Sequence, residues 1–219
     1  MSPATLILDR VTKARRRPRG VAPGFDLAAD LTLEGPLVVG ILGGNGAGKT
    51  TLFNLISGRE APDTGRVLCG GHDIHRVVYE DRVHLVSHQT QRHDNRRFGF
   101  AGWSRLAVSM YERLHRRVRV PATKPRIHLW DEPDLHDGYF PLQMHHMRHL
   151  KSQGHIVLLC AHPHRPRDLA MLRAVCDRYL FLQRGRIEPL ADYEALLAHA
   201  PAREYLGDLV ERLEAPELA

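Results

Sequence analysis

A glycine-rich loop constrains the fold of this chain more than any other feature. Its residues, GGNGAGKTT from Gly43 to Thr51, fit the pattern Gly-x-x-x-x-Gly-Lys-Ser/Thr of a phosphate-binding loop, or P-loop. Backbone N–H groups in such a loop turn inward on the phosphates at a helix N-terminus, whose dipole favours negative charge. Lys49 is expected to reach the outer phosphates, and Thr50 to join the oxygen ligands of Mg2+. The predicted phosphate-binding residues are Gly43, Gly44, Asn45, Gly46, Ala47, Gly48, Lys49, Thr50 and Thr51.

The segments on both sides of the loop support this prediction. The run 37–42 before the loop is almost wholly apolar and indicates a buried strand. After the loop, apolar residues recur at helical spacing over 52–56, and Gly58 and Pro62 then break the pattern. Strand, glycine loop and helix therefore follow one another in the order that a P-loop requires.

Composition favours one globular domain in a reducing compartment. The chain has 219 residues, 43% hydrophobic and 26% charged, and no apolar run approaches the roughly 20 residues that cross a bilayer. The N-terminus lacks a secretion signal, and three scattered cysteines lack metal-ligand spacing, so we expect a cytoplasmic protein. The net charge of +6 gathers at 13–20 and 113–120. Such clusters permit a nucleic-acid or anionic-lipid partner, although most are solvated faces.

Alternating and apolar segments predict the rest of the fold. The first two alternating stretches are expected to pair antiparallel ahead of the P-loop strand. Helices between the later apolar strands imply an α/β fold, with a mainly parallel sheet covered on both faces. The expected strands lie at 4–12, 25–35, 37–42, 65–74, 81–89, 126–133, 155–161 and 178–187. The expected helices lie at 52–56, 103–118, 141–152, 167–176 and 191–218.

Two adjacent carboxylates end the apolar strand IHLWDEP. Asp131 and Glu132 stand at the tip of this strand, where one carboxylate can hold Mg2+ through water. Its neighbour can face the water that attacks a terminal phosphate. Together with the P-loop, this pair predicts a site for nucleotide hydrolysis.

These motifs resemble those of the ATP-binding cassette (ABC) family, the ATPase subunits that mostly power membrane transporters. GGNGAGKTTL is similar to the phosphate loop of the family, LWDEP to its second nucleotide motif, and LLCAHP to the strand that ends in its switch histidine. CDRYLFLQRGRI is similar to the strand that follows, and VSHQTQ to the glutamine loop. In the last motif Gln89 is the expected contact, with His88 as the alternative if the register slips by one. The resemblance covers nearly the whole chain.

The resemblance implies a P-loop NTPase fold of the ABC ATPase type, with an N-terminal antiparallel β subdomain. It implies one nucleotide-binding domain over residues 1–219, with a helical tail at about 190–219.

The resemblance also implies ATP and Mg2+ as ligands, and a role for each matched residue. Gln89 and Thr50 would ligate Mg2+, and Asp131 would hold the ion through water. Glu132 would polarise the attacking water, and His162 would contact both the terminal phosphate and the catalytic glutamate.

Several departures from the family concern its dimer. The Leu-Ser-Gly-Gly-Gln signature is absent, and in FAGWS at 100–104 only Gly102 matches cleanly. The helical subdomain is reduced to about 90–120. The family places an aromatic ring on adenine, whereas this chain offers Arg15 or Arg16, and an arginine can stack on a planar base.

The expected function is that of a subunit that binds and hydrolyses Mg-ATP and drives a separate transmembrane permease. Such a chain would lie on the cytoplasmic face of the membrane and dimerise with itself or with a second ABC ATPase chain. Because the signature is missing, an alternative stays open: a regulatory or binding module with impaired hydrolysis, which could contact nucleic acid through its basic clusters.

Overall fold

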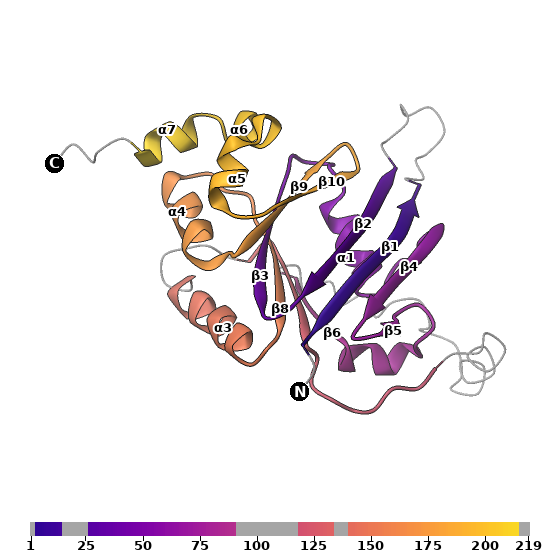
Figure 1. The fold of residues 1–219 in the computed structure, drawn as a ribbon. Helices are drawn as coiled ribbons and strands as arrows, with labels where there is room; N and C mark the ends of the chain where they lie inside the picture. Colours follow the sequence, from indigo (N-terminus) through magenta and orange to yellow (C-terminus); the bar gives the residue numbers. More distant parts are fainter. Residues whose placement is uncertain (1–2, 15–25, 91–117, 134–139, 215–219) are drawn as a thin grey trace.

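A ten-stranded sheet organises the part of the chain that the computed structural model describes, residues 3–14, 26–90, 118–133 and 140–214. The strand order is β5-β4-β1-β2-β10-β9-β3-β8-β7-β6 (Figure 1). The strands are β1 (Thr5–Lys13), β2 (Leu27–Glu34), β3 (Leu37–Leu42), β4 (Thr64–Cys69), β5 (His72–Asp73), β6 (Val86–Thr90), β7 (Ile127–Asp131), β8 (Ile156–Cys160), β9 (Arg178–Gln183) and β10 (Arg186–Leu190).

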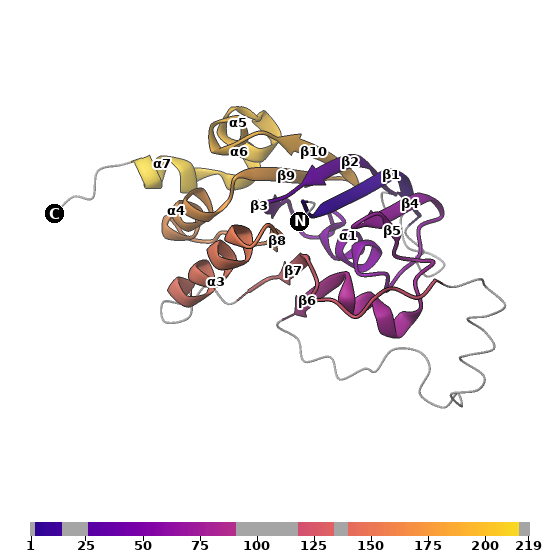
Figure 2. The ribbon, with the colours of Figure 1, turned by 60° about the horizontal axis from the view of Figure 1, so that its bottom comes forward.

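Helices cover both faces of the sheet. α1 packs on one face, and α3 to α7 pack on the other (Figure 2). None of the helices in the described ranges is both long and apolar enough to span a membrane. The helices are α1 (Lys49–Ile56), the 3-10 helix η1 (Tyr79–His84), α3 (Phe140–Ser152), α4 (Pro166–Val175), α5 (Tyr193–Ala198), α6 (Ala200–Leu206) and α7 (Asp208–Glu214).

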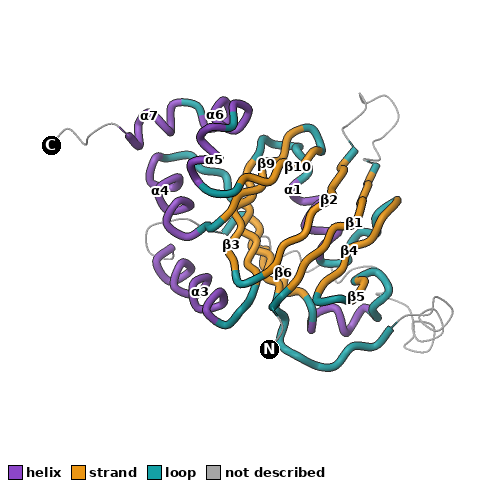
Figure 3. Tube along the Cα trace, viewed as in Figure 1, coloured by secondary structure: helices purple, strands orange, loops and turns teal. Residues whose placement is uncertain are grey.

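The sheet combines a parallel and an antiparallel part, as the sequence predicts. β9, β3, β8, β7 and β6 pair in parallel. β1 pairs antiparallel with β2 and with β4, and Figure 3 shows these strands across from the helical layer of α3 to α7. A single parallel pair, Arg186 with Ala28, joins β10 to β2. The strand tips that carry the predicted site therefore belong to the parallel part.

The central strand β3 separates two hydrophobic cores. Because side chains alternate along a strand, Val39 and Ile41 join the core of α1, while Val38 and Leu42 join the core of α3 to α7. All four side chains are fully buried. This burial on both faces explains why the run before the P-loop is continuously apolar.

Three expected strands differ from those in the structure. The segment 65–74 is interrupted by the turn at Gly70 and Gly71 and forms β4 and β5. The segment 81–89 starts inside η1, so its strand begins only at Val86. The segment 178–187 is the β9–β10 hairpin, because Arg184 and Gly185 adopt positive φ and reverse the chain. The helix expected at 103–118 lies almost entirely outside the described residues.

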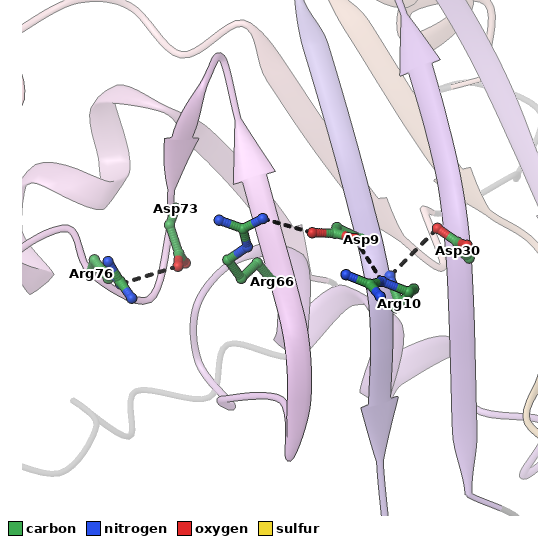
Figure 4. Close-up of polar contacts among 6 residues, drawn as sticks. All are labelled: Asp9, Arg10, Asp30, Arg66, Asp73 and Arg76. Carbon is green, nitrogen blue, oxygen red and sulfur yellow. Dashed lines mark hydrogen bonds and ion pairs between the residues drawn. The ribbon is translucent and has the colours of Figure 1, made fainter.

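A row of charged side chains crosses the antiparallel part (Figure 4). Arg66 Nη2 lies 2.9 Å from Asp9 Oδ2, and the backbone N–H of Arg10 donates to Asp30 Oδ1 at 3.4 Å. Hydrogen bonds from Arg66 and Arg10 lower the pKa of Asp9. Exposed pairs of this kind contribute little stability.

Candidate nucleotide site

Glycine is required at two positions of the P-loop. Gly43 has φ +145°, and a Cβ there would lie 2.2 Å from the carbonyl oxygen of Leu182 in β9. Gly48, with φ +116°, is the N-cap of α1. An L-residue is strained in these conformations. The two glycines therefore let the chain leave β3, pass against β9 and enter α1 within a few residues.

Lys49 is held across the loop by backbone carbonyls. Its side chain is 7% exposed, and its Nζ donates to the carbonyl oxygens of Gly43 at 2.5 Å and Gly44 at 3.0 Å. Burial lowers the pKa of Lys49, and the neighbouring acidic groups, including Glu132 and Asp131, act in the opposite direction. The ammonium is thus fixed in the loop within electrostatic range of both carboxylates.

The remaining loop residues divide into an exposed and a buried group. Asn45, Gly46 and Thr50 are exposed, whereas Ala47 is buried. The N–H of Ala47 donates to Gly44 at 3.1 Å, and the carbonyl of Ala47 accepts from Gly185 N–H at 3.1 Å. The loop is therefore tied to the β9–β10 turn on one side and open on the other. Gly44, Gly48 and Thr51 are of intermediate exposure.

Asp131 ends β7 beside β8. It pairs with Cys160 in the sheet, and the Cys160 thiol donates a hydrogen bond to its carboxylate. Burial raises the pKa of Cys160 to about 12, so this side chain is a neutral donor. Burial and the nearby Glu132 raise the pKa of Asp131, while the hydrogen bond from Cys160 and the charge of Lys49 lower it.

Glu132 turns toward β8 through an unusual backbone conformation. Its φ is +49°, uncommon for a residue with a side chain, and its N–H donates to the carbonyl of Cys160 at 3.0 Å. Its Oε1 lies 3.3 Å from Nε2 of His162, which follows β8. The predicted catalytic glutamate and switch histidine are therefore in contact.

His162 is largely enclosed and has a second partner. Its side chain is 19% exposed, and its Nδ1 lies 3.2 Å from the hydroxyl of Tyr205 in α6. Burial, followed by the charge of Lys49, lowers the pKa of His162, while Glu132 raises it. Sequence reasoning missed Tyr205, because no local pattern connects a residue of the helical tail with β8.

The structure separates the two alternatives of the glutamine loop. In β6, His88 pairs with Leu129, and its ring meets Phe53 of α1 edge-on at 5.7 Å between centroids. Gln89 pairs with Trp130 and is exposed. Directly paired residues share a sheet face. His88 therefore lies on the face of α1, and Gln89 on the opposite face.

Burial also governs the charge of His88, since it lowers the pKa of this imidazole to about 4.

The structure does not describe the predicted adenine contact, Arg15 or Arg16, or the segment FAGWS.

The donor set fits ATP and Mg2+. A Cβ would collide with the backbone at Gly43, so the chain itself keeps this loop narrow, with Lys49 inside it. Thr50 and Asp131 offer the hard oxygen ligands that Mg2+ prefers. No group of three metal-ligating side chains occurs in the described part of the chain.

The fold and the loop define a P-loop nucleotide-binding protein, and comparisons with known proteins show which family it resembles. Residues 28–101 match the model of the family described as ABC transporter. The hemin import ATP-binding protein HmuV of Pseudomonas putida is 29% identical across 78% of this chain and 82% of its own length. A probable ABC transporter ATP-binding protein of Azorhizobium caulinodans is 28% identical across 78% of this chain and 73% of its own. The chain is therefore similar to ATP-binding subunits of ABC transporters over most of its length.

Other similarities are more local or concern the fold alone. The methionine import ATP-binding protein MetN of Cereibacter sphaeroides is 43% identical over 72 residues, which are 32% of this chain. This chain matches only 20% of the length of that relative. A solved structure of the ATP-binding subunit of an ABC transporter superposes with a TM-score of 0.61 and 19% identity, covering 96% of this chain and 99% of its own.

Proposed function

We propose that this chain binds and hydrolyses Mg-ATP and couples that cycle to a separate membrane permease. One observation carries the proposal. The P-loop with its buried Lys49 follows β3, and the contact between Glu132 and His162 joins the ends of the neighbouring strands β7 and β8. Adjacent parallel strands thus bring a phosphate-binding group and an acid–base pair to the same edge of the sheet.

Each residue has a task that its surroundings support. The N–H groups of the loop and the Lys49 ammonium bind phosphate oxygens, and Thr50 and Asp131 would hold Mg2+. ATP supplies the phosphoryl group that is transferred, and Mg2+ neutralises its developing charge. Glu132 orients water and accepts its proton. His162 donates from Nε2 toward Glu132, and the distance of 3.3 Å allows this bond.

Coupling to a permease is the second part of the proposal. The relatives are named as import or transporter ATP-binding proteins. By analogy, the permease would be another chain, and this one would sit on the cytoplasmic face of the membrane. It would act as a dimer with itself or with a second ABC ATPase. The names of these relatives give no support to a nucleic-acid partner, and we do not propose one.

Nucleotide titration tests the first part. Isothermal titration of the wild-type chain with Mg-ATP should show saturable binding, and Lys49→Ala should weaken it at least about tenfold, because hydrogen bonds from a charged group contribute roughly 1.5–3 kcal/mol. The control is Lys151→Ala. Lys151 pairs with Asp177 at 2.5 Å, and Asp177 accepts from the N–H of Val38 near the start of β3, whereas the P-loop follows the other end of this strand. Equal affinity in Lys49→Ala and Lys151→Ala would contradict the assignment.

Copurification tests the second part. We expect the tagged chain, extracted from membranes in mild detergent, to bring down a membrane-spanning chain whose presence raises ATP turnover. A regulatory module would bind Mg-ATP with the same affinity and show no change in turnover with any membrane chain. That outcome would refute coupling and leave the nucleotide site intact.

A further inference from the structure

A tyrosine from the helical tail reaches the switch histidine. Tyr205, in α6, places its hydroxyl 3.2 Å from Nδ1 of His162, although 43 residues separate the two in sequence. We propose that Tyr205 is a positioning residue that fixes the tautomer and the ring orientation of His162. The effect of Tyr205 on the rate rests on the proposed hydrolysis of ATP. The assignment of the His162 tautomer is independent of that proposal.

The proton positions follow from the partners on each side of the ring. An ionised carboxylate can only accept a hydrogen bond, so the contact of Glu132 Oε1 with Nε2 at 3.3 Å places the proton on Nε2. A neutral imidazole then carries a bare Nδ1, which can only accept. The phenol of Tyr205 must therefore be the donor. Burial raises the pKa of this phenol to about 12 and keeps it protonated.

The packing of Tyr205 gives the hydroxyl little freedom. The Tyr205 ring lies 5.9 Å from the ring of Phe181 in β9. α6 itself is anchored by the buried side chains of Ala202 and Leu206. At its start, His199 Nδ1 accepts from the N–H of Ala202, as an N-cap does. The donor is thus presented by an element that is packed on the sheet rather than by a loose tail.

Tyr205 also faces the P-loop. A pocket of about 380 Å3 opens between the loop, the end of β9 and α6, and its lining includes Gly44, Asn45 and Tyr205. Other charged or titratable groups act on His162 from the surrounding elements, namely Lys49, Glu132 and His164. Of these, Glu132 contacts the imidazole at Nε2, which leaves Nδ1 to Tyr205. The hydroxyl of Tyr205 therefore connects α6 with the catalytic pair Glu132 and His162.

NMR can test the tautomer without nucleotide. Long-range nitrogen–proton spectra of the histidine-labelled chain, with His162 assigned by a His162→Asn variant, should show the wild-type ring protonated on Nε2 with a hydrogen-bonded Nδ1. In Tyr205→Phe the Nδ1 signal should move to that of a nitrogen that accepts no hydrogen bond. A wild-type ring protonated on Nδ1 would overturn the proposal, even if no Tyr205 variant folds.

Kinetics provide the second readout. Tyr205→Phe should lower kcat up to about tenfold and leave KM for ATP within about twofold. The reason is that the free energy of one hydrogen bond corresponds to a factor of up to about ten in rate, and this bond acts on the reaction rather than on ATP binding.

The matched control is Tyr179→Phe. That variant also removes a buried phenol hydroxyl, which donates to the carbonyl of Leu172 at 3.0 Å and not to His162 or Glu132. If both variants lower kcat equally, or if neither changes it while the wild type hydrolyses ATP, Tyr205 has no positioning role. If the wild type fails to hydrolyse ATP even with its membrane partner, the proposed function fails, and the NMR test of Tyr205 still stands.

Discussion

A buried histidine that contacts a second, half-buried histidine should make this protein sensitive to mild acid. His128 in β7 is 8% exposed, and its Nε2 lies 3.0 Å from Nδ1 of His155. The two rings stack with 5.1 Å between their centroids. Burial, together with His155 and His146, lowers the pKa of His128 from 6.5 to about 4. Replacing His128 with glutamine keeps a group that can form hydrogen bonds and removes the titration.

The sign and size of the effect follow from linkage. The folded state binds the proton less readily than the unfolded state, so the stability contributed by His128 is present above pH 6.5 and is lost as the pH falls toward 4. With these two pKa values, the free energy of unfolding falls by about 2 kcal/mol between pH 7 and pH 5. His88, whose pKa is also lowered to about 4, contributes in both proteins and cancels from the comparison.

Urea denaturation at pH 7, 6 and 5 measures the effect. The wild type should lose about 2 kcal/mol more over this range than His128→Gln, with the slope on urea unchanged at each pH. His145→Gln, at an exposed position of α3, controls for the general loss of one imidazole. Equal losses in the wild type and in His128→Gln would show that His128 does not titrate in this range and would refute the reasoning.

Two further predictions concern hydrolysis. Glu132→Gln should keep Mg-ATP affinity and abolish turnover, since the amide preserves shape and cannot accept a proton; phosphate release equal to wild type would remove Glu132 from the mechanism. The purified chain alone should hydrolyse ATP poorly, because Trp103 would be too bulky if it occupied the second glycine place of the signature, and loss of one transition-state donor costs roughly 100-fold. Steady-state phosphate release with Glu132→Gln as the blank measures this, and fast cooperative turnover without a partner would show that FAGWS works as a signature.

The nucleotide loop and the sheet around it could be predicted from sequence because their signals are local. Glycine at Gly43 and Gly48 is demanded by the backbone conformation within the loop itself. The apolar run of β3 reflects burial on both faces, which any covered parallel strand requires. The tip of β7 likewise shows its two carboxylates directly in the sequence.

The ends of strands and the positions of turns were harder to predict from the sequence, because they depend on a few backbone angles. The β9–β10 hairpin turns at Arg184 and Gly185, both with positive φ, and arginine carries no turn preference that would have marked the reversal. In β6, the alternation of side chains was predictable, but the face toward α1 was not. Only packing against Phe53 decided that His88, rather than Gln89, lies on that face.

By itself, the sequence determined the P-loop, the order of the main elements and the pair Asp131 and Glu132, because each depends on neighbouring residues or on a short period. The tertiary structure decided which distant groups meet. Glu132 reaches His162 because β7 and β8 are adjacent in the sheet. Tyr205 reaches His162 because α6 folds back over β9. Contacts of this kind arise from the packing of whole elements, and no residue spacing along the chain encodes them.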